Sequence, residues 1–340
     1  MKRIILSMLL FIMAVVSPGQ KGYAQKVQDK FSNDAKTTMY LFRKTSPFFL
    51  NEERIALLNK FQTYSDSLPY TTFDKYLISP EQTSIDMEIA NPILYCYRNA
   101  FDSVIDEVKN TKVEYGTAVI WVLYNMGMVV KTPSGCFGID INHLWAEKLE
   151  PYLDFICVTH NHEDHKSIEL MESMNRKGKP VLSNFFESGG KYFSKTPANY
   201  KIGNFSICTD IADHNTTLLN FISVFRIDCG KDAGNFSILH CGDSNFNPMQ
   251  FTHVQGPVNL AILRFGAPAE NNISGTGDGM VKPDYAVLSH EIELRHRINE
   301  SPQRVSIAKV LNRIPRMKYE HTILPFWGEK LIWKNGNLYK

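Results

Sequence analysis

Residues 155–165 read FICVTHNHEDH, an apolar run followed by a cluster of histidines and acids. An apolar, strand-like run from Phe155 to Thr159 ends in four side chains that can ligate a metal: His160, His162, Asp164 and His165. Side chains repeat every two residues on extended backbone, so the first two imidazoles point to the same side and can reach one ion. Where the chain then turns into a helix, the last two side chains can be directed at a second ion. Imidazole and carboxylate are ligands that suit zinc and its first-row neighbours, so the stretch predicts a metal site at a strand end.

The HxHxDH spacing resembles the signature of the metallo-β-lactamase superfamily, and the resemblance covers about residues 112–340. It implies an α/β (α+β) fold, an αββα sandwich, here with an N-terminal helical extension. It also implies further ligands at later strand ends, and the sequence supplies His214, Asp243 and His290 in that order. His296 and His321 compete for the last position. A different alignment places Trp327 there, which would leave the second ion one ligand short.

The resemblance implies two divalent ions that share one carboxylate. His160, His162, His214 and Asp243 would hold the first ion, and Asp164, His165, Asp243 and His290 the second. Such ions lower the pKa of a bound water from 15.7 to roughly 7 and so create hydroxide at neutral pH. We therefore expect a metal-dependent hydrolase with Asp164 and Asp243 as catalytic carboxylates. Zinc is the default metal from the ligand types, and manganese or iron tolerate the same set.

The residues after the motif narrow the branch of the family. Lys166 and Ser167 follow His165, whereas lactonase-like and thioesterase-like members have a small residue and Gly-Gly there. The motif is more similar to that of phosphodiesterases such as the N-acyl-phosphatidylethanolamine phospholipase D enzymes and to the ascorbate-phosphate lactonase. A diiron oxygen reductase would carry Glu in place of His162. The expected substrate is a small molecule with a phosphodiester or a cyclic or acyl ester; lactam hydrolysis and a metal-binding protein that recognises without catalysis are the alternatives.

Several other residues have two interpretations each. Asp140 could hold a ligand imidazole or form a turn. Glu163, His240 and Glu291 could protonate a leaving group or serve only as solvated or structural residues. Cys241 could ligate zinc as a thiolate, but cysteines inside apolar strands are usually small buried hydrophobes. None of the six cysteines forms a CxxC pair, and we expect buried free thiols.

The N-terminus has the pattern of a secretory signal peptide, residues 1–24. Lys2 and Arg3 precede an apolar run, and Gly22-Tyr23-Ala24 offers a small-residue cleavage site before Gln25. The run ends at residues 17–19, too early for a membrane span. We therefore expect a periplasmic or secreted protein with no stable membrane anchor after cleavage.

The rest of the chain has two parts. Residues 25–110 are helical in pattern, with a clear apolar stripe along a helix from Pro92 to Val108 that we expect to dock near the site. Residues 111–340 form the hydrolase domain, rich in short strands, with helices near Ile168 to Met174 and from Pro302 to Ile314, the latter capped by Ser301. Thr322 to Phe326 is the last expected strand.

The chain has 37 Lys+Arg against 35 Asp+Glu and a net charge of +2. This balance of charges gives no indication of a basic surface that would bind nucleic acid. The sequence does not indicate an oligomeric state.

Overall fold

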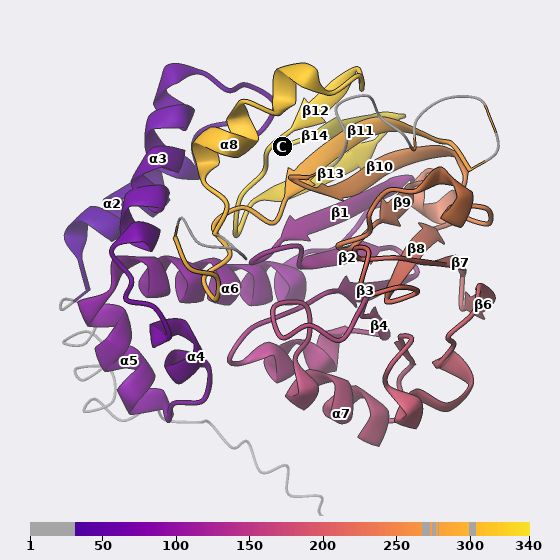
Figure 1. Cartoon of the computed structure of the whole chain (residues 1–340), viewed down its shortest axis with the longest axis horizontal. Helices are drawn as coiled ribbons and strands as arrows, with labels where there is room; N and C mark the ends of the chain where they lie inside the picture. The colour runs from indigo at the N-terminus through magenta and orange to yellow at the C-terminus, as the bar shows by residue number, and fades with distance from the viewer. Residues whose placement is uncertain (1–30, 267–272, 274–276, 278, 299–303) are drawn as a thin grey trace, which may run out of the picture.

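Figure 1 shows the computed structural model of the chain, which describes residues 31–266, 273, 277, 279–298 and 304–340. The predicted signal peptide and Ser301 lie outside these residues. Among the helices of the described residues, none is long and apolar enough to cross a membrane. All six cysteines are described, and all are free thiols.

Two seven-stranded mixed sheets form the centre of the molecule. In spatial order, the first sheet consists of β14 (Asn337–Tyr339), β13 (Lys330–Lys334), β1 (Thr117–Val122), β2 (Met128–Thr132), β3 (Gly135–Ile139), β4 (Phe155–Cys157) and β5 (Val181–Leu182). The second consists of β12 (His321–Ile323), β11 (Val281–Ser289), β10 (Gly256–Arg264), β9 (Ser237–His240), β8 (Ile222–Asp228), β7 (Phe205–Ala212) and β6 (Ala198–Ile202).

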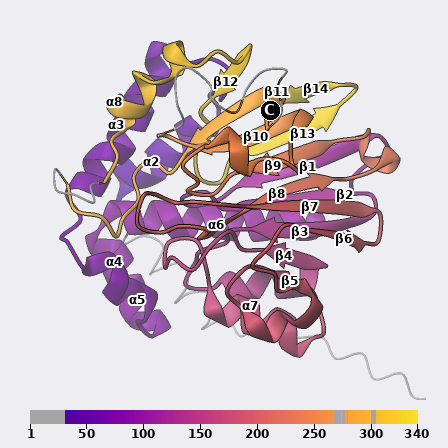
Figure 2. The ribbon, with the colours of Figure 1, turned by 45° about the vertical axis from the view of Figure 1, so that its right-hand side comes forward.

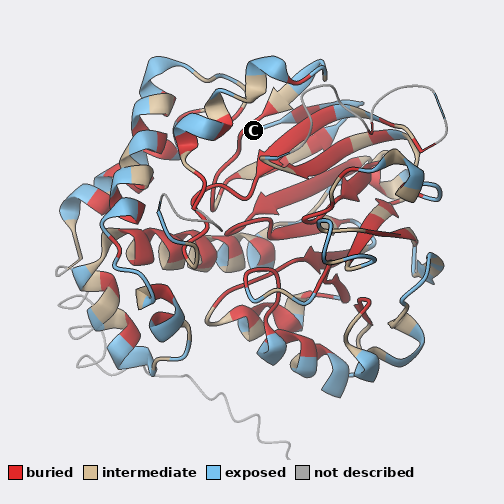
Figure 3. Cartoon of the chain, viewed as in Figure 1, coloured by how far each residue is buried: buried red, intermediate tan, exposed pale blue. Residues whose placement is uncertain are grey.

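Alternation along the strands builds the layers between and outside these sheets. In β1, Ile120 and Val122 belong to the core between the two sheets, whereas Val119 and Trp121 face the opposite side and pack with helices. This is the period-2 pattern of a strand that is buried on both faces. Figure 3 shows both sheets almost wholly buried, with exposed residues gathered on the outer helices.

Helices cover the outer face of each sheet. Phe101, Val104 and Val108 of α6 (Pro92–Asn110) and Leu170 of α7 (Ile168–Arg176) pack on the first sheet. Residues of α8 (Ile307–Leu311) pack on the second sheet, together with the N-terminal helices. The layer order is thus helix, sheet, sheet, helix, which confirms the expected α/β sandwich (Figure 2).

The N-terminal helices are part of this packing. They are α2 (Asn33–Phe42), α3 (Glu52–Asp66), α4 (Thr72–Leu77), α5 (Glu81–Ala90) and α6. Arg54 of α3 forms a fully buried ion pair with Glu329, with Nη2 and Oε2 2.6 Å apart. Phe61 of the same helix stacks on Phe326 with ring centroids 4.8 Å apart. The helical segment therefore shares a core with the second sheet, and the proposed division at residues 110 and 111 falls between α6 and β1.

Three expectations at the C-terminal end of the chain need correction. The helix expected from Pro302 is α8, which begins only after Ser306, whose side chain accepts a hydrogen bond from Lys309 N. The strand expected to reach Phe326 ends at Ile323, because Pro325 lacks an N–H and Phe326 N instead donates to Glu329 Oε2 at 2.8 Å. Strands β13 and β14, which extend the first sheet beyond β1, were not expected.

Short 3-10 turns complete the structure at Ala146–Tyr152, Glu187–Tyr192, Lys231–Ala233, Pro248–Gln250 and Ile314–Arg316.

Candidate metal centre

The seven candidate ligands lie where strands of both sheets end. The segment 160–165 begins three residues beyond β4, His214 lies two residues beyond β7, Asp243 lies three residues beyond β9, and His290 is the first residue after β11. Strands β9, β10 and β11 are parallel, so their carboxyl ends share one edge of the second sheet. The fold thus brings together residues that are up to 130 positions apart in the sequence.

The ligand atoms form overlapping clusters. Three groups have ligand atoms that all lie within 4.8 Å of one another: His160, His162 and His214; His160, His165 and Asp243; and Asp164, His165 and His290. The two groups at the ends correspond to the two expected ion positions, and the middle group joins them. His160 and His165 are fully buried, whereas His162 and His214 are partly exposed.

Asp243 lies between the two positions. Its Oδ2 is 3.5 Å from Nε2 of His214 and 3.3 Å from Nε2 of His290. Gly242 makes this placement possible, because its φ is +48° and a Cβ there would lie 2.8 Å from Cβ of Thr159. Only glycine adopts such a conformation readily while packing so close to another strand end. His290 also has a positive φ, +71°, which is uncommon outside glycine and typical of functional sites.

Burial and charge give the imidazoles opposite protonation tendencies. Burial lowers the pKa of His160 well below its usual value, and it lowers that of His162 as well. Burial also disfavours the charged form of His165, but Asp164, Asp243 and Asp140 outweigh it and raise its pKa to about 9. In the same way Asp243 leads the groups that raise the pKa of His290 against burial. The carboxyl of Asp243 is held well below its usual pKa despite burial, chiefly by His290 and His165.

This donor set fits divalent metal ions. Asp243 Oδ1 is buried and accepts no hydrogen bond within the described residues, and it lies 3.6 Å from Nε2 of His165. Five imidazoles and two carboxylates converge in this largely buried site, and imidazole nitrogens and carboxylate oxygens are ligands that zinc and its first-row neighbours take. Neutral His160 and His162 with ionised Asp164 and Asp243 are the protonation states that metal binding requires.

A layer of hydrogen bonds behind the ligands fixes their orientation. Asp140 Oδ2 accepts from His165 Nδ1 at 2.8 Å and from the Thr159 hydroxyl at 2.6 Å. With the hydroxyl proton given to Asp140, Thr159 Oγ1 accepts from Nδ1 of His160 at 2.9 Å. Both imidazoles thereby keep Nε2 for an ion. Asp140 therefore holds a ligand imidazole in position, which is the first of the two interpretations given for it above.

The residues that compete for the last ligand position lie in different surroundings. His321 on β12 is half-exposed, stacks on Tyr285 and pairs with it in register. Tyr285 precedes His290 by five residues of β11, which is roughly 16 Å along a strand. Trp327 is buried among aromatic rings, including that of Tyr124 at 5.2 Å. His296 is nearer, with its ring centroid 6.3 Å from that of His290, but its Nδ1 is paired with Glu293.

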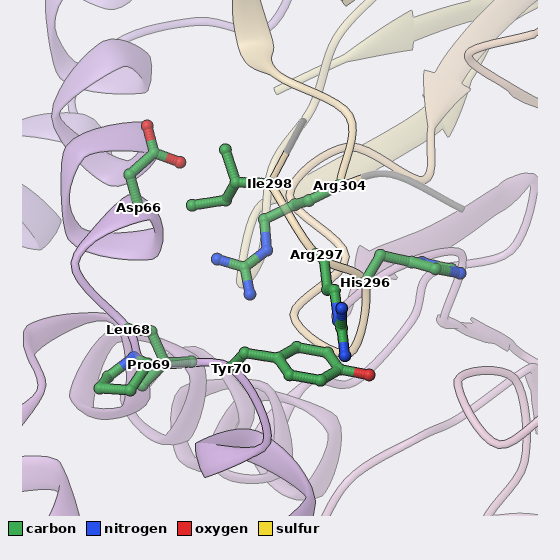
Figure 4. Close-up of a pocket in the computed structure, with 8 residues that line it drawn as sticks. All are labelled: Asp66, Leu68, Pro69, Tyr70, His296, Arg297, Ile298 and Arg304. Carbon is green, nitrogen blue, oxygen red and sulfur yellow. The ribbon is translucent and has the colours of Figure 1, made fainter. Parts of the chain in front are cut away.

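The segment after His290 is held by Tyr124, which follows β1, and by Arg304, which links it to α3. Tyr124 OH donates to Glu293 Oε1 at 2.7 Å and accepts from Leu294 N at 2.8 Å. Arg304 donates from Nη2 to Leu294 O at 2.9 Å and from Nη1 to Ser65 Oγ at 3.0 Å, which ties the segment to the end of α3. Figure 4 shows Arg304 extending toward that helix across a pocket of about 450 Å³, lined by Asp66, Leu68, Pro69, Tyr70, His296, Arg297, Ile298 and Arg304. The helical segment thus supports one wall of the metal site.

A cavity of about 530 Å³ opens over the ligands. It is lined by His162, Glu163, Asp164, His214, Asn215, Leu218, Asp243, Arg264, Phe265, His290, Arg295 and His296. Of the three candidates for a proton donor, only Glu163 lines it. His240 is fully buried with Nε2 on Met126 O, and Glu291 is buried outside the lining. Cys241 is buried too, burial raises the pKa of its thiol, and it belongs to none of the ligand clusters.

Sequence reasoning missed four residues of this site. Asn125 donates from Nδ2 to Asp164 Oδ2 at 3.2 Å, and Asn215 lies 3.0 Å from Nδ1 of His214. Neither has a sequence signal beyond its place in a polar turn. Arg264 and Arg295 line the cavity, and Arg264 could have been found, because it ends an expected strand at the same edge as Asp243 and His290.

No protein-family profile and no curated protein matches the sequence. Solved structures with a related fold include a metallo hydrolase from the archaeon Ignicoccus hospitalis, with 18% identity, TM-score 0.44, and 64% of this chain and 99% of that chain covered. The metallo-β-lactamase fold protein YhfI from Bacillus subtilis has 14% identity and TM-score 0.42, with 64% and 98% covered. CmlA, a diiron β-hydroxylase from Streptomyces venezuelae, has 14% identity and TM-score 0.44, with 66% and 55% covered.

These likenesses are distant, so the fold assignment rests on the molecule itself. Two mixed sheets pack face to face between helical layers, and the HxHxDH segment follows a strand of the first sheet. The later candidate ligands stand at strand ends of the second sheet, in the order that the resemblance implied. The chain therefore has the αββα sandwich architecture that the resemblance to the metallo-β-lactamase superfamily implied.

Proposed function

We propose that the protein is a metal-dependent hydrolase that holds two divalent ions and cleaves a phosphodiester or a cyclic or acyl ester of a small molecule. The observation that carries this proposal is the pair of ligand clusters, joined by His160, His165 and Asp243, at the floor of an open cavity. A cavity of about 530 Å³ has the size of a small-molecule site. Zinc is the default metal, with manganese or iron as alternatives.

The chain's own groups divide the work of such a reaction. Divalent ions in this site would acidify a water molecule and polarise the substrate's carbonyl or phosphoryl oxygen. Asp164 and Asp243 are ionised at neutral pH, since neighbouring histidines outweigh their burial, and they can accept hydrogen bonds from the attacking water. Of the three candidate proton donors Glu163 alone lines the cavity, and its carboxylate pairs with Lys166 Nζ at 2.7 Å, so it would have to take up a proton before giving one to the leaving group.

A substrate screen tests the proposal. We would purify the protein with added zinc, measure metal content, and assay bis(4-nitrophenyl) phosphate, a chromogenic lactone and a chromogenic cephalosporin. The Asp243→Asn variant is the inactive control. Turnover of the phosphodiester or the lactone that is lost in the variant supports the proposal. Preferential turnover of the cephalosporin would point to lactam hydrolysis, and full metal content with no turnover of any substrate would point to a recognition protein.

We also propose export of the protein with removal of residues 1–24, on the charge and apolar pattern of that segment. Mass spectrometry of the protein from a cell fractionation would give a mature chain that starts at Gln25 in the periplasmic or secreted fraction. A chain that keeps residues 1–24 in the cytosol would contradict export and leave the hydrolase proposal unaffected.

A further inference from the structure

Two arginines reach the cavity beside the metal ligands. Arg264 is the last residue of β10, and its Nε is buried without a hydrogen-bond partner. Among the residues that the structure describes, no carboxylate forms an ion pair with its guanidinium, and its one charge-related contact is with the Phe246 ring at 6.0 Å. Arg295 also has a buried, unpartnered Nε, while its Nη1 lies 3.4 Å from the half-exposed Asp74.

The acids of the cavity do not neutralise Arg264. Asp164 and Asp243 face the imidazoles and would be neutralised by metal ions. Glu163, the remaining acid of the lining, pairs with Lys166 at 2.7 Å. A partly buried guanidinium without a counter-charge is unfavourable, and its planar fork matches the oxygens of carboxylate or phosphate.

The apolar residues of the cavity lining indicate what the rest of the ligand is made of. Phe265 follows Arg264 directly, and its ring lies 6.0 Å from that of His290. Leu218 lines the cavity as well. An apolar body next to an anionic group would therefore contact both kinds of wall.

We propose that Arg264, assisted by Arg295, binds an anionic oxygen-bearing group of the substrate, a carboxylate or a phosphate, beside the bond that is cleaved. Arg264 is then the residue that selects acidic substrates over neutral ones. This inference rests on the proposed function only in placing the scissile bond at the metal centre. The binding of the anion itself needs no turnover, so it can be tested separately.

Calorimetry with non-hydrolysable anions provides that test. Zinc-loaded wild-type protein is titrated with phenylphosphonate and with benzoate, and the same titrations are made with Arg264→Gln, Arg264→Lys and the control Arg226→Gln. Arg226 is a partly buried arginine of β8 that pairs with Asp228 and does not line the cavity. Loss of a charge-assisted hydrogen-bonded pair predicts a Kd that rises about 10- to 100-fold in Arg264→Gln. Arg264→Lys should give a smaller rise, because it keeps the charge and loses the fork.

The outcomes separate the possibilities. A larger loss for phenylphosphonate assigns a phosphate group to the substrate, and a larger loss for benzoate assigns a carboxylate. Unchanged affinity in both Arg264 variants, an equal loss in Arg226→Gln, or no binding by the wild type would overturn the proposal. If Arg264→Gln loses zinc or its folded circular dichroism, Arg264→Lys decides alone, and wild-type affinity in it would also overturn the proposal. A protein that hydrolyses none of the screened esters but still binds anions through Arg264 would contradict the hydrolase and leave this inference standing.

Discussion

Asp140 and His165 form a fully buried hydrogen bond, with Oδ2 of the first 2.8 Å from Nδ1 of the second. The carboxylate fixes the imidazole so that Nε2 faces Asp164 and Asp243, at 3.5 and 3.6 Å. We predict that Asp140→Asn lowers the affinity of the second position, to which His165 would contribute, about 10- to 100-fold. This is the usual effect of removing the hydrogen-bond partner of a ligand imidazole. Competition with a chromogenic chelator measures this.

Asp210→Asn is the matched control for this prediction. Asp210 is also buried and also holds a histidine, His253, with its Oδ1 2.7 Å from Nδ1, but that histidine belongs to none of the ligand clusters. Equal metal affinity in Asp140→Asn and Asp210→Asn would show that Asp140 does not act through His165.

The position of Asp243 between two clusters predicts coupled loss of metal. Asp243→Ala should lose both ions, because the carboxylate faces His214 on one side and His290 on the other. His160→Ala should mainly empty the first position. Elemental analysis after metal-replete purification should give close to two ions per chain in the wild type. Equal metal content in wild type and Asp243→Ala would remove Asp243 from the site.

The last ligand can be identified by comparing three variants. His290→Ala should lower occupancy of the second ion and activity far more than His296→Ala or His321→Ala. Its Nε2 is 3.2 Å from Oδ2 of Asp164, whereas His321 stacks on Tyr285 in the middle of β11. If His321→Ala alone emptied the second position, the different alignment, which places Trp327 at the last ligand position, would be favoured.

Much of this site could be predicted because its signals are local. The segment 160–165 is continuous in sequence, and the resemblance to the metallo-β-lactamase superfamily implied later ligands at strand ends, where His214, Asp243 and His290 each follow a strand-like run or a short turn after one. Arg264 was overlooked although it ends an expected strand, whereas the role of Asn125 could not be predicted, because it depends on which segments become neighbours. The short strands β13 and β14 were missed for the same reason: β13 is stabilised by pairing with β1, some 200 residues earlier in the chain. The start of α8 was predicted too early, because the sequence pattern favoured Ser301 as the cap, whereas the side chain of Ser306 caps the helix.

Metal-free protein should lose stability as the pH rises. The pKa of His165 is about 9 in the folded chain, above the 6.5 of an unperturbed histidine, chiefly because three carboxylates outweigh its burial. The protonated form thus stabilises the fold fully below pH 6.5, and this contribution is lost as the pH rises to 9. It amounts to about 3 kcal/mol. Urea unfolding of chelator-treated protein at pH 6.5 and pH 9 measures the change.

The zinc-loaded protein should behave in the opposite way over the same range. Metal binding requires neutral imidazoles, so zinc displaces the protons of His165 and His290, and higher pH favours the loaded state. His165→Asn should reduce the decline of the metal-free protein and leave the part that His290 contributes, because the pKa of His290 is also raised by Asp243 and Asp164, whereas the control His253→Asn should retain the full decline. Stability of the metal-free wild type that rises toward pH 9 would contradict the assignment.

The final prediction concerns the buried ion pair that joins the helical segment to the end of the hydrolase domain. Arg54 Nη1 donates to Glu329 Oε1 at 2.9 Å, and Nη2 donates to Leu324 O at 2.7 Å. Glu329 Oε2 in turn accepts from Phe326 N at 2.8 Å. Arg54→Ala leaves the buried carboxylate of Glu329 with only Lys340 as a counter-charge, 3.8 Å from Oε1, and should lower the free energy of unfolding by about 3 to 5 kcal/mol. Arg43→Ala is the control, because Arg43 is exposed and contacts Asn99 on another helix.

By the same reasoning, residues 112–340 expressed alone should be insoluble or altered in specificity, because they would expose the surface that α3 and α6 cover. A soluble, metal-loaded fragment with unchanged activity and substrate range would show that the helices have no part in shaping the site.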